Sequence, residues 1–150
     1  MAEQFATLAG VTASLSAIGI VTEDMAESVR FYRLLGVNVP DPSGDHLDAT
    51  LPSGIRLMWD TLELIRQLEP DWTPPVGHRM ALAFECASPR EVDDVHNRIV
   101  GAGFDSKKEP WDAFWGQRYA QVVDPDATWS TSSPSCRRRR VRATSPRAPA

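Results

Sequence analysis

One order of elements occurs twice in this sequence and limits the folds that it can adopt: a strand, an amphipathic helix, then short strands. Residues 15–22 and 80–86 are apolar or β-branched over the length of a buried strand. Residues 24–35 and 88–103 follow them and repeat apolar side chains at helical spacing. The two copies lie about 65 residues apart, a period that indicates a duplicated structural unit. We therefore predict an α+β fold with two similar halves.

Matching cap residues bound the two predicted helices. Asp24 and Ser88 are N-cap residues, whose side-chain oxygens can accept hydrogen bonds from free backbone amides of the first turn. Gly36 and Gly103 follow the last apolar residues, where helices commonly end in a left-handed conformation. The same start and stop signals in both halves support the repeat.

Shorter elements complete the predicted domain. Turn residues separate three further strands and a short helix, predicted at 45–51, 55–60, 118–124 and 61–69 respectively. The two tryptophans at positions 111 and 115 are placed in a loop before the last of these strands. We divide the chain into a flexible leader at 1–14, a domain at 15–126 with halves at about 15–68 and 79–126, and a tail at 127–150.

Charge separates the domain from its tail. All 20 acidic residues precede Ala127, whereas six of the 16 Lys and Arg residues follow Asp126. The body therefore carries ten basic against 20 acidic residues, a net charge of −10, and the tail carries +6. A domain with this negative charge repels the phosphate backbone of nucleic acids, which argues against nucleic-acid binding by the folded domain. No apolar run approaches the roughly 20 residues that cross a bilayer, and no secretory signal is evident, so we expect a cytoplasmic protein without membrane contact.

Motifs in both halves resemble one known family. The first helix, DMAESVRFYRLLGV, has an Asp-hydrophobic pair, then Ser, Phe-Tyr and Leu-Gly, and the second half has LAFEC, GAGF and WGQRYAQVVDPD in that order. This set resembles the glyoxalase, bleomycin-resistance and dioxygenase superfamily, known as the vicinal oxygen chelate superfamily, over Leu15–Asp126. The resemblance implies two βαβββ modules that form a curled, partly open mixed sheet around a cavity, with the helices outside.

The resemblance also implies where a metal would bind. Enzymes of the superfamily usually hold a divalent metal through His and Glu side chains, and the matching positions here are Ala17 and Ala81. A methyl group cannot ligate a metal. The carboxylate of the family's final strand is also missing, because the family pattern stops at Asp126. We predict a protein without a catalytic metal; the alternative is a metal-dependent lyase, isomerase or dioxygenase with unusual ligands.

The three histidines do not restore this set. His46 lies beside a turn and His96 lies in a helix, so we expect surface or packing roles for both. His78 precedes its predicted strand by a few residues and is the one histidine near the expected metal position.

Strand alternation predicts which side chains line the cavity. Small residues alternate with bulky ones in both first strands, so Ala17 and Gly19 share one face, and Ala81 shares another with Glu85. Small side chains leave room for a ligand. A buried Glu85 would need a cationic ligand group or a partner such as Arg118, whereas at the strand end it would lie at the surface.

Four aromatic residues are candidates for the cavity wall: Trp59, Trp111, Trp115 and Tyr119. Metal-free relatives such as the bleomycin-binding proteins hold planar ligands between aromatic side chains. We therefore predict binding of a small planar or aromatic molecule by these four residues with Glu85 and Arg118. The alternatives are that the rings fill the core, or that an indole packs at a dimer interface, because the family commonly forms homodimers.

The tail after Asp126 has a possible origin in a shifted reading frame. A GC-rich coding stretch for Gly-Asn-Val-Val-Asp-Leu-Phe-Ala-Leu-Leu that loses its first base encodes the observed residues from Ala127 to Cys136. The amino-acid sequence in the original frame contains the Gly-Asn pair and the final strand that the family pattern has and this chain lacks. The alternative is a genuine disordered basic tail.

Overall fold

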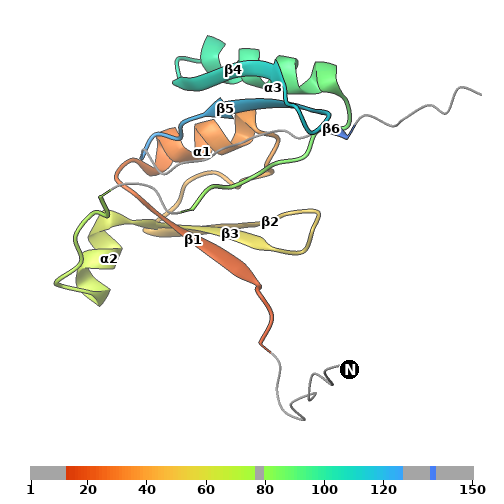
Figure 1. Ribbon diagram of the computed structural model, residues 1–150. Coiled ribbons are helices and arrows are strands. Elements are labelled where there is room, and N and C mark those ends of the chain that lie inside the picture. Colours follow the sequence, from red (N-terminus) through yellow and green to blue (C-terminus); the bar gives the residue numbers. More distant parts are fainter. Residues whose placement is uncertain (1–12, 77–79, 127–135, 138–150) are drawn as a thin grey trace, which may run out of the picture.

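A computed structural model describes residues 13–76, 80–126 and 136–137. Figure 1 shows its elements, which are β1 (Ala17–Thr22), α1 (Met25–Leu34), β2 (His46–Thr50), β3 (Arg56–Thr61), α2 (Leu62–Leu68), α3 (Pro89–Gly101), β4 (Ser106–Asp112), β5 (Gln117–Val122) and β6 (Cys136–Arg137). Across the described ranges, no helix has the length and apolar character needed to span a membrane.

The described strands form two separate three-stranded sheets. The first has the order β1-β3-β2, with β1 parallel and β2 antiparallel to β3. The second has the order β4-β5-β6 with antiparallel pairing throughout. One mixed and one antiparallel sheet, packed with helices, confirm the predicted α+β fold.

The caps predicted from the sequence hold both long helices. The Asp24 side chain accepts a hydrogen bond from the Glu27 amide at 3.0 Å, and Ser88 Oγ accepts one from the Glu91 amide at 3.2 Å. Gly36 lies at φ +93° after α1, in a backbone conformation that residues other than glycine rarely adopt. The helix boundaries therefore follow from local chemistry.

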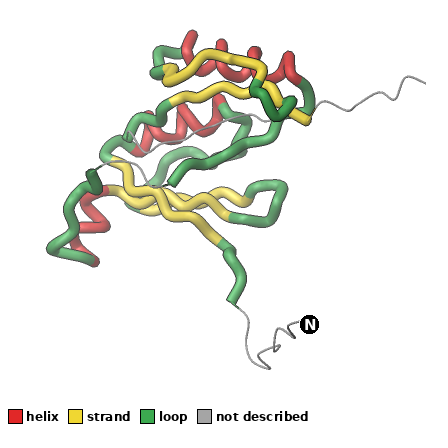
Figure 2. The backbone as a smooth tube through the Cα atoms, viewed as in Figure 1, coloured by secondary structure: helices red, strands yellow, loops and turns green. Residues whose placement is uncertain are grey.

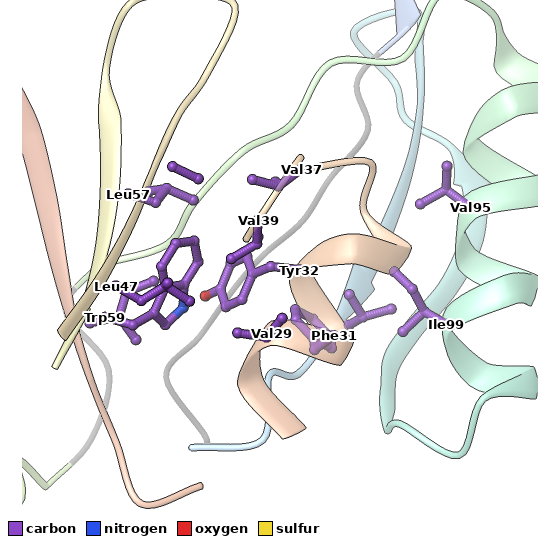
Figure 3. Packing of buried hydrophobic residues seen from close by; sticks show 13 residues of the cluster. Val29, Phe31, Tyr32, Val37, Val39, Leu47, Leu57, Trp59, Val95 and Ile99 are labelled. Atoms are coloured by element: carbon purple, nitrogen blue, oxygen red, sulfur yellow. The ribbon is translucent and has the colours of Figure 1, made fainter. Parts of the chain in front are cut away.

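The core lies between the first sheet and α1 and extends to α3 (Figure 3). Trp59 on β3 packs against Tyr32 on α1, with ring centroids 5.2 Å apart. On the other side of α1, Phe31 meets Phe104 at 5.1 Å, and Ile99 of α3 belongs to the same buried cluster. The halves thus meet mainly through α1 and α3, whereas the two sheets make no extensive contact with each other.

The structure corrects one predicted strand. Residues 80–86 belong to no strand and are drawn as loop in Figure 2, although their burial alternates and Leu82 and Phe84 pack against the core. In the first half, β1 pairs in parallel with β3, the last strand of that half. The residues of the second half that correspond to β3 begin after Asp126, and 127–135 lie outside the described residues. The burial of residues 80–86 therefore alternates as predicted, but no described strand pairs with them.

One strand was missed. Trp111 was predicted to lie in a loop but belongs to β4, whereas Trp115 does lie in a turn. The strand was missed because Pro110 and two lysines hide the alternation expected of a strand. Among the described strands it pairs with β5 alone, and this pairing contains register shifts between Ser106 and Trp111. Proline and irregular pairing are both tolerated at a sheet edge.

Candidate functional site

Three of the predicted aromatic residues lie together on the second sheet. Trp111 of β4 and Tyr119 of β5 are paired in register, and their ring centroids are 5.7 Å apart. Trp115, from the turn between these strands, meets Tyr119 at 5.3 Å. Ala120 and Val122 alternate with Tyr119 and are buried on the α3 side, so Tyr119 faces away from the helix. We call Trp111, Trp115 and Tyr119 the aromatic face.

A tight turn presents one of these rings. The Ala113 amide donates to the Gln117 carbonyl at 2.8 Å, which closes the β4–β5 hairpin. Trp115 Nε1 then donates to Gln117 Oε1 at 2.9 Å, so the indole is held although the residue is 50% exposed. Phe114 in the same turn is 98% exposed and packs edge-on against Trp115 at 4.8 Å. Phe114 was not singled out from the sequence.

Lys108, which was not predicted from the sequence, adjoins the aromatic face. Lys108 Nζ lies 3.8 Å from the centroid of the Trp111 ring, a cation–π contact. Residues three apart in a regular strand lie on opposite faces, but the register shift between Lys108 and Trp111 brings them together. No local sequence signal predicts such a bulge.

Trp59 lies apart from the other three aromatic residues. It is fully buried and faces α1, together with Leu57 two residues before it. The sequence did contain a signal for this, because the polar Arg56 and Asp60 alternate with the two apolar residues. Trp59 therefore contributes to the core and not to the aromatic face.

Arg118 and Glu85 also lie apart from the aromatic face. Arg118 Nε donates to Asp93 of α3 at 2.7 Å, and its Nη1 donates to Asp112 at 3.3 Å. The hydrogen bond to Asp93 is the main reason that the pKa of Arg118 is raised above its ordinary value. Glu85 is exposed, in line with the surface alternative. The structure thus pairs Arg118 with two aspartates and not with Glu85.

The first sheet also has a face opposite its helix, formed by the residues that alternate with the buried ones. Gly19 is exposed there, and a Cβ built on it would meet nothing within 4 Å. The polar side chains of this face contact one another: His46 Nδ1 lies 2.6 Å from Asp60 Oδ1, and Arg56 donates to Asp48 at 3.0 Å. This face therefore carries small side chains on β1 and polar or charged side chains on β2 and β3.

The described residues do not fit a divalent metal centre. Ala17 and Ala81 offer no donor atom, and the described part of the chain contains no group of three or more His, Cys, Asp or Glu that could hold a metal ion. His96 is 5% exposed and its Nε2 lies 2.8 Å from Ser106 Oγ, which is a packing role. His78 falls outside the described residues.

A shallow hollow on the outer side of α1 lies away from the aromatic face. Its lining includes Arg30 and Arg33, but both guanidinium groups are already bound. Arg30 pairs with Glu27 and donates to the Ala102 carbonyl, and Arg33 donates to the Val39 carbonyl. Both arginines of this hollow therefore already have partners within the chain, and neither guanidinium group is free to bind a ligand.

Solved structures share this fold. A glyoxalase/bleomycin resistance protein/dioxygenase from Nocardioides is 24% identical, with 82% of this chain and 87% of that chain covered and a TM-score of 0.62. A glyoxalase/bleomycin resistance protein/dioxygenase family enzyme from Burkholderia phytofirmans PsJN is 19% identical, with 77% and 94% covered and a TM-score of 0.68. A lactoylglutathione lyase from Agrobacterium tumefaciens is 15% identical, with 79% and 90% covered and a TM-score of 0.58.

The sequence itself is related to the same group. No curated protein matches it. The sequence profile of the Glyoxalase/Bleomycin resistance protein/Dioxygenase superfamily, however, matches residues 14–129, which is most of the chain and includes both halves. The chain belongs to the glyoxalase, bleomycin-resistance and dioxygenase superfamily.

Proposed function

We propose that this protein binds a small planar or aromatic molecule on the aromatic face without a catalytic metal. The observation that carries the proposal is the grouping of Trp111, Trp115 and Tyr119 on the side of the second sheet that faces away from α3. None of the three rings is buried, unlike Trp59. Each aromatic pair formed with a ligand stabilises a complex by about 0.5 to 1.5 kcal/mol beyond area burial.

The alternative within the superfamily is a metal-dependent lyase, isomerase or dioxygenase. A lactoylglutathione lyase is among the structures of similar fold, but at 15% identity the likeness extends to the fold alone. An enzyme of this kind would need donor side chains where Ala17 and Ala81 stand. The donor chemistry of the chain therefore favours binding over metal catalysis.

Pairing into a homodimer would complete the site. Among the described elements, the two sheets make no extensive contact with each other, so neither sheet covers the helix-free face of the other. Gly19 and Ala17 on one such face complement the large rings on the other. A two-fold pairing would set the first sheet of one chain against the aromatic face of its partner and enclose a cavity. Light scattering should report a dimer at micromolar concentration; a stable monomer would contradict this pairing.

The tail is proposed to be the product of a shifted reading frame. The support is the match of residues 127–136 to a frame-shifted Gly-Asn-Val-Val-Asp-Leu-Phe-Ala-Leu-Leu, together with the absence of a parallel partner for residues 80–86 among the described strands. Restoring one base near codon 127 should raise the melting temperature by supplying that strand. A restored chain that is no more stable would count against the shifted frame.

Binding is tested by ligand titration of the full chain against matched variants. Quenching of tryptophan fluorescence by a panel of planar aromatic compounds should saturate, and Trp111→Leu and Tyr119→Leu should each weaken the binding about tenfold, the equivalent of about 1.4 kcal/mol. Trp72→Leu is the control, because Trp72 follows α2 and is not part of the aromatic face. Equal loss in all three variants, or saturation by no compound, would contradict the proposal.

A further inference from the structure

We propose that the aromatic face selects planar aromatic anions and that Lys108 supplies the opposing positive charge. This inference rests on the proposed binding function and adds the chemical class of the ligand. Its basis is the position of the Lys108 ammonium, 3.8 Å from the Trp111 ring centroid at the edge of the cluster. An ammonium beside an exposed aromatic wall offers both stacking and charge to a ring that bears a carboxylate.

Lys108 is a cation without a carboxylate partner among the ion pairs of the described residues. Its contact is with the π-face of Trp111, a weaker attraction than a close ion pair in a partly desolvated site. The residue is exposed and its four-carbon stem is flexible. The ammonium can therefore leave the ring and follow a ligand carboxylate at little cost.

The charged residues that adjoin Tyr119 and Trp111 in the sequence, Arg118 and Asp112, are bound to each other. Arg118 extends to the α3 side, where it binds Asp93 and Asp112, so Asp112 does not oppose an anion on the aromatic face. In the proposed dimer, the partner's first sheet would bring two carboxylates, of which Asp48 is paired with Arg56 and Asp60 is in hydrogen-bond contact with His46. Lys108, in contrast, takes part in no ion pair of the described residues.

This arrangement discriminates by charge. An anionic ring gains the ammonium of Lys108 as a counter-ion, and a neutral ring gains stacking alone. A cationic ring must displace Lys108 from Trp111 and is repelled by it. Affinity should therefore fall in the order anion, neutral molecule, cation for ligands that share one ring system.

Isothermal titration of the full chain with three naphthalene probes tests this order. We expect 2-naphthoate to bind about two- to fivefold more tightly than 2-naphthamide, and 2-naphthylmethylammonium to bind most weakly. Added salt should reduce the preference for the anion, because it screens an exposed charge. Lys108→Gln should abolish the preference while leaving the affinity for 2-naphthamide within about twofold.

Lys107→Gln is the matched control, because it removes the same charge one residue earlier on β4. It should keep the preference for 2-naphthoate. Equal binding of the three probes to the unmodified chain, tightest binding of the cation, or an anion preference that persists in Lys108→Gln would overturn the inference while leaving the binding function intact. Binding of none of the probes would instead contradict the proposed function, and the inference with it.

Discussion

Replacement of Trp59 tests whether this residue stabilises the core, in contrast to the residues of the aromatic face. Trp59 is fully buried and contacts the Tyr32 ring, so Trp59→Ala should lower the free energy of unfolding by about 3 to 5 kcal/mol, the range for large aromatic side chains in cores. Trp111 is only half-buried, so Trp111→Ala should cost no more than about 1.5 kcal/mol, chiefly its contact with Tyr119.

A conservative replacement refines this expectation. Trp59 Nε1 is buried and has no hydrogen-bond partner within the described part of the chain. Trp59→Phe therefore removes an unsatisfied donor, whose burial costs about 1 to 3 kcal/mol, and this gain offsets much of the lost packing. We expect Trp59→Phe to be less destabilising than Trp59→Ala by at least about 2 kcal/mol.

Urea denaturation followed by far-ultraviolet circular dichroism measures these differences without relying on tryptophan emission. Each variant is compared with the unmodified chain through its midpoint and slope. If Trp59→Ala cost no more than Trp111→Ala, or Trp59→Phe as much as Trp59→Ala, the assignment of Trp59 to the core would be refuted.

Three further changes test separate parts of the structure. Tyr32→Phe removes a donor to the buried Asp124 carboxylate and should cost about 1.5 to 3 kcal/mol by urea denaturation; no loss would mean that this bond is absent. Burial raises the pKa of Asp126, so the unmodified chain is relatively more stable when this carboxyl is protonated and loses that stability as pH rises through the raised pKa. Asp126→Asn keeps an acceptor for the Glu23 amide and should therefore be more stable than the unmodified chain at pH 7 but not at pH 3, measured by thermal melts at both values. Ser88→Ala should cost about 1 kcal/mol through loss of the α3 N-cap, and an unchanged melting temperature would argue against that cap.

Features set by neighbouring residues were predictable from the sequence. The caps at Asp24 and Ser88 and the alternation of β1 depend on side chains a few positions apart, and each agrees with the structure. The family motifs combined such local signals in one order, which is why the fold class could be predicted although each motif alone is weak.

Features that depend on distant partners were not predictable. Residues 80–86 have the pattern of a strand, but a strand also needs a hydrogen-bonded neighbour. The contact of Lys108 with Trp111 arises from the irregular pairing of β4 with β5, which no spacing rule reveals. Trp59 was placed with the other aromatics by residue type, whereas the alternation of β3 assigns it to the helix side.

The indole Nε1–H resonances of the tryptophans test the binding claim most directly. In ¹H–¹⁵N spectra of the full chain titrated with 2-naphthoate, the resonances of Trp111 and Trp115 should shift and saturate together at one dissociation constant. Those of Trp59, in the core, and Trp72, after α2, should stay in place. Shifts confined to Trp59 or Trp72, or no saturable shift at Trp111 and Trp115, would contradict the account.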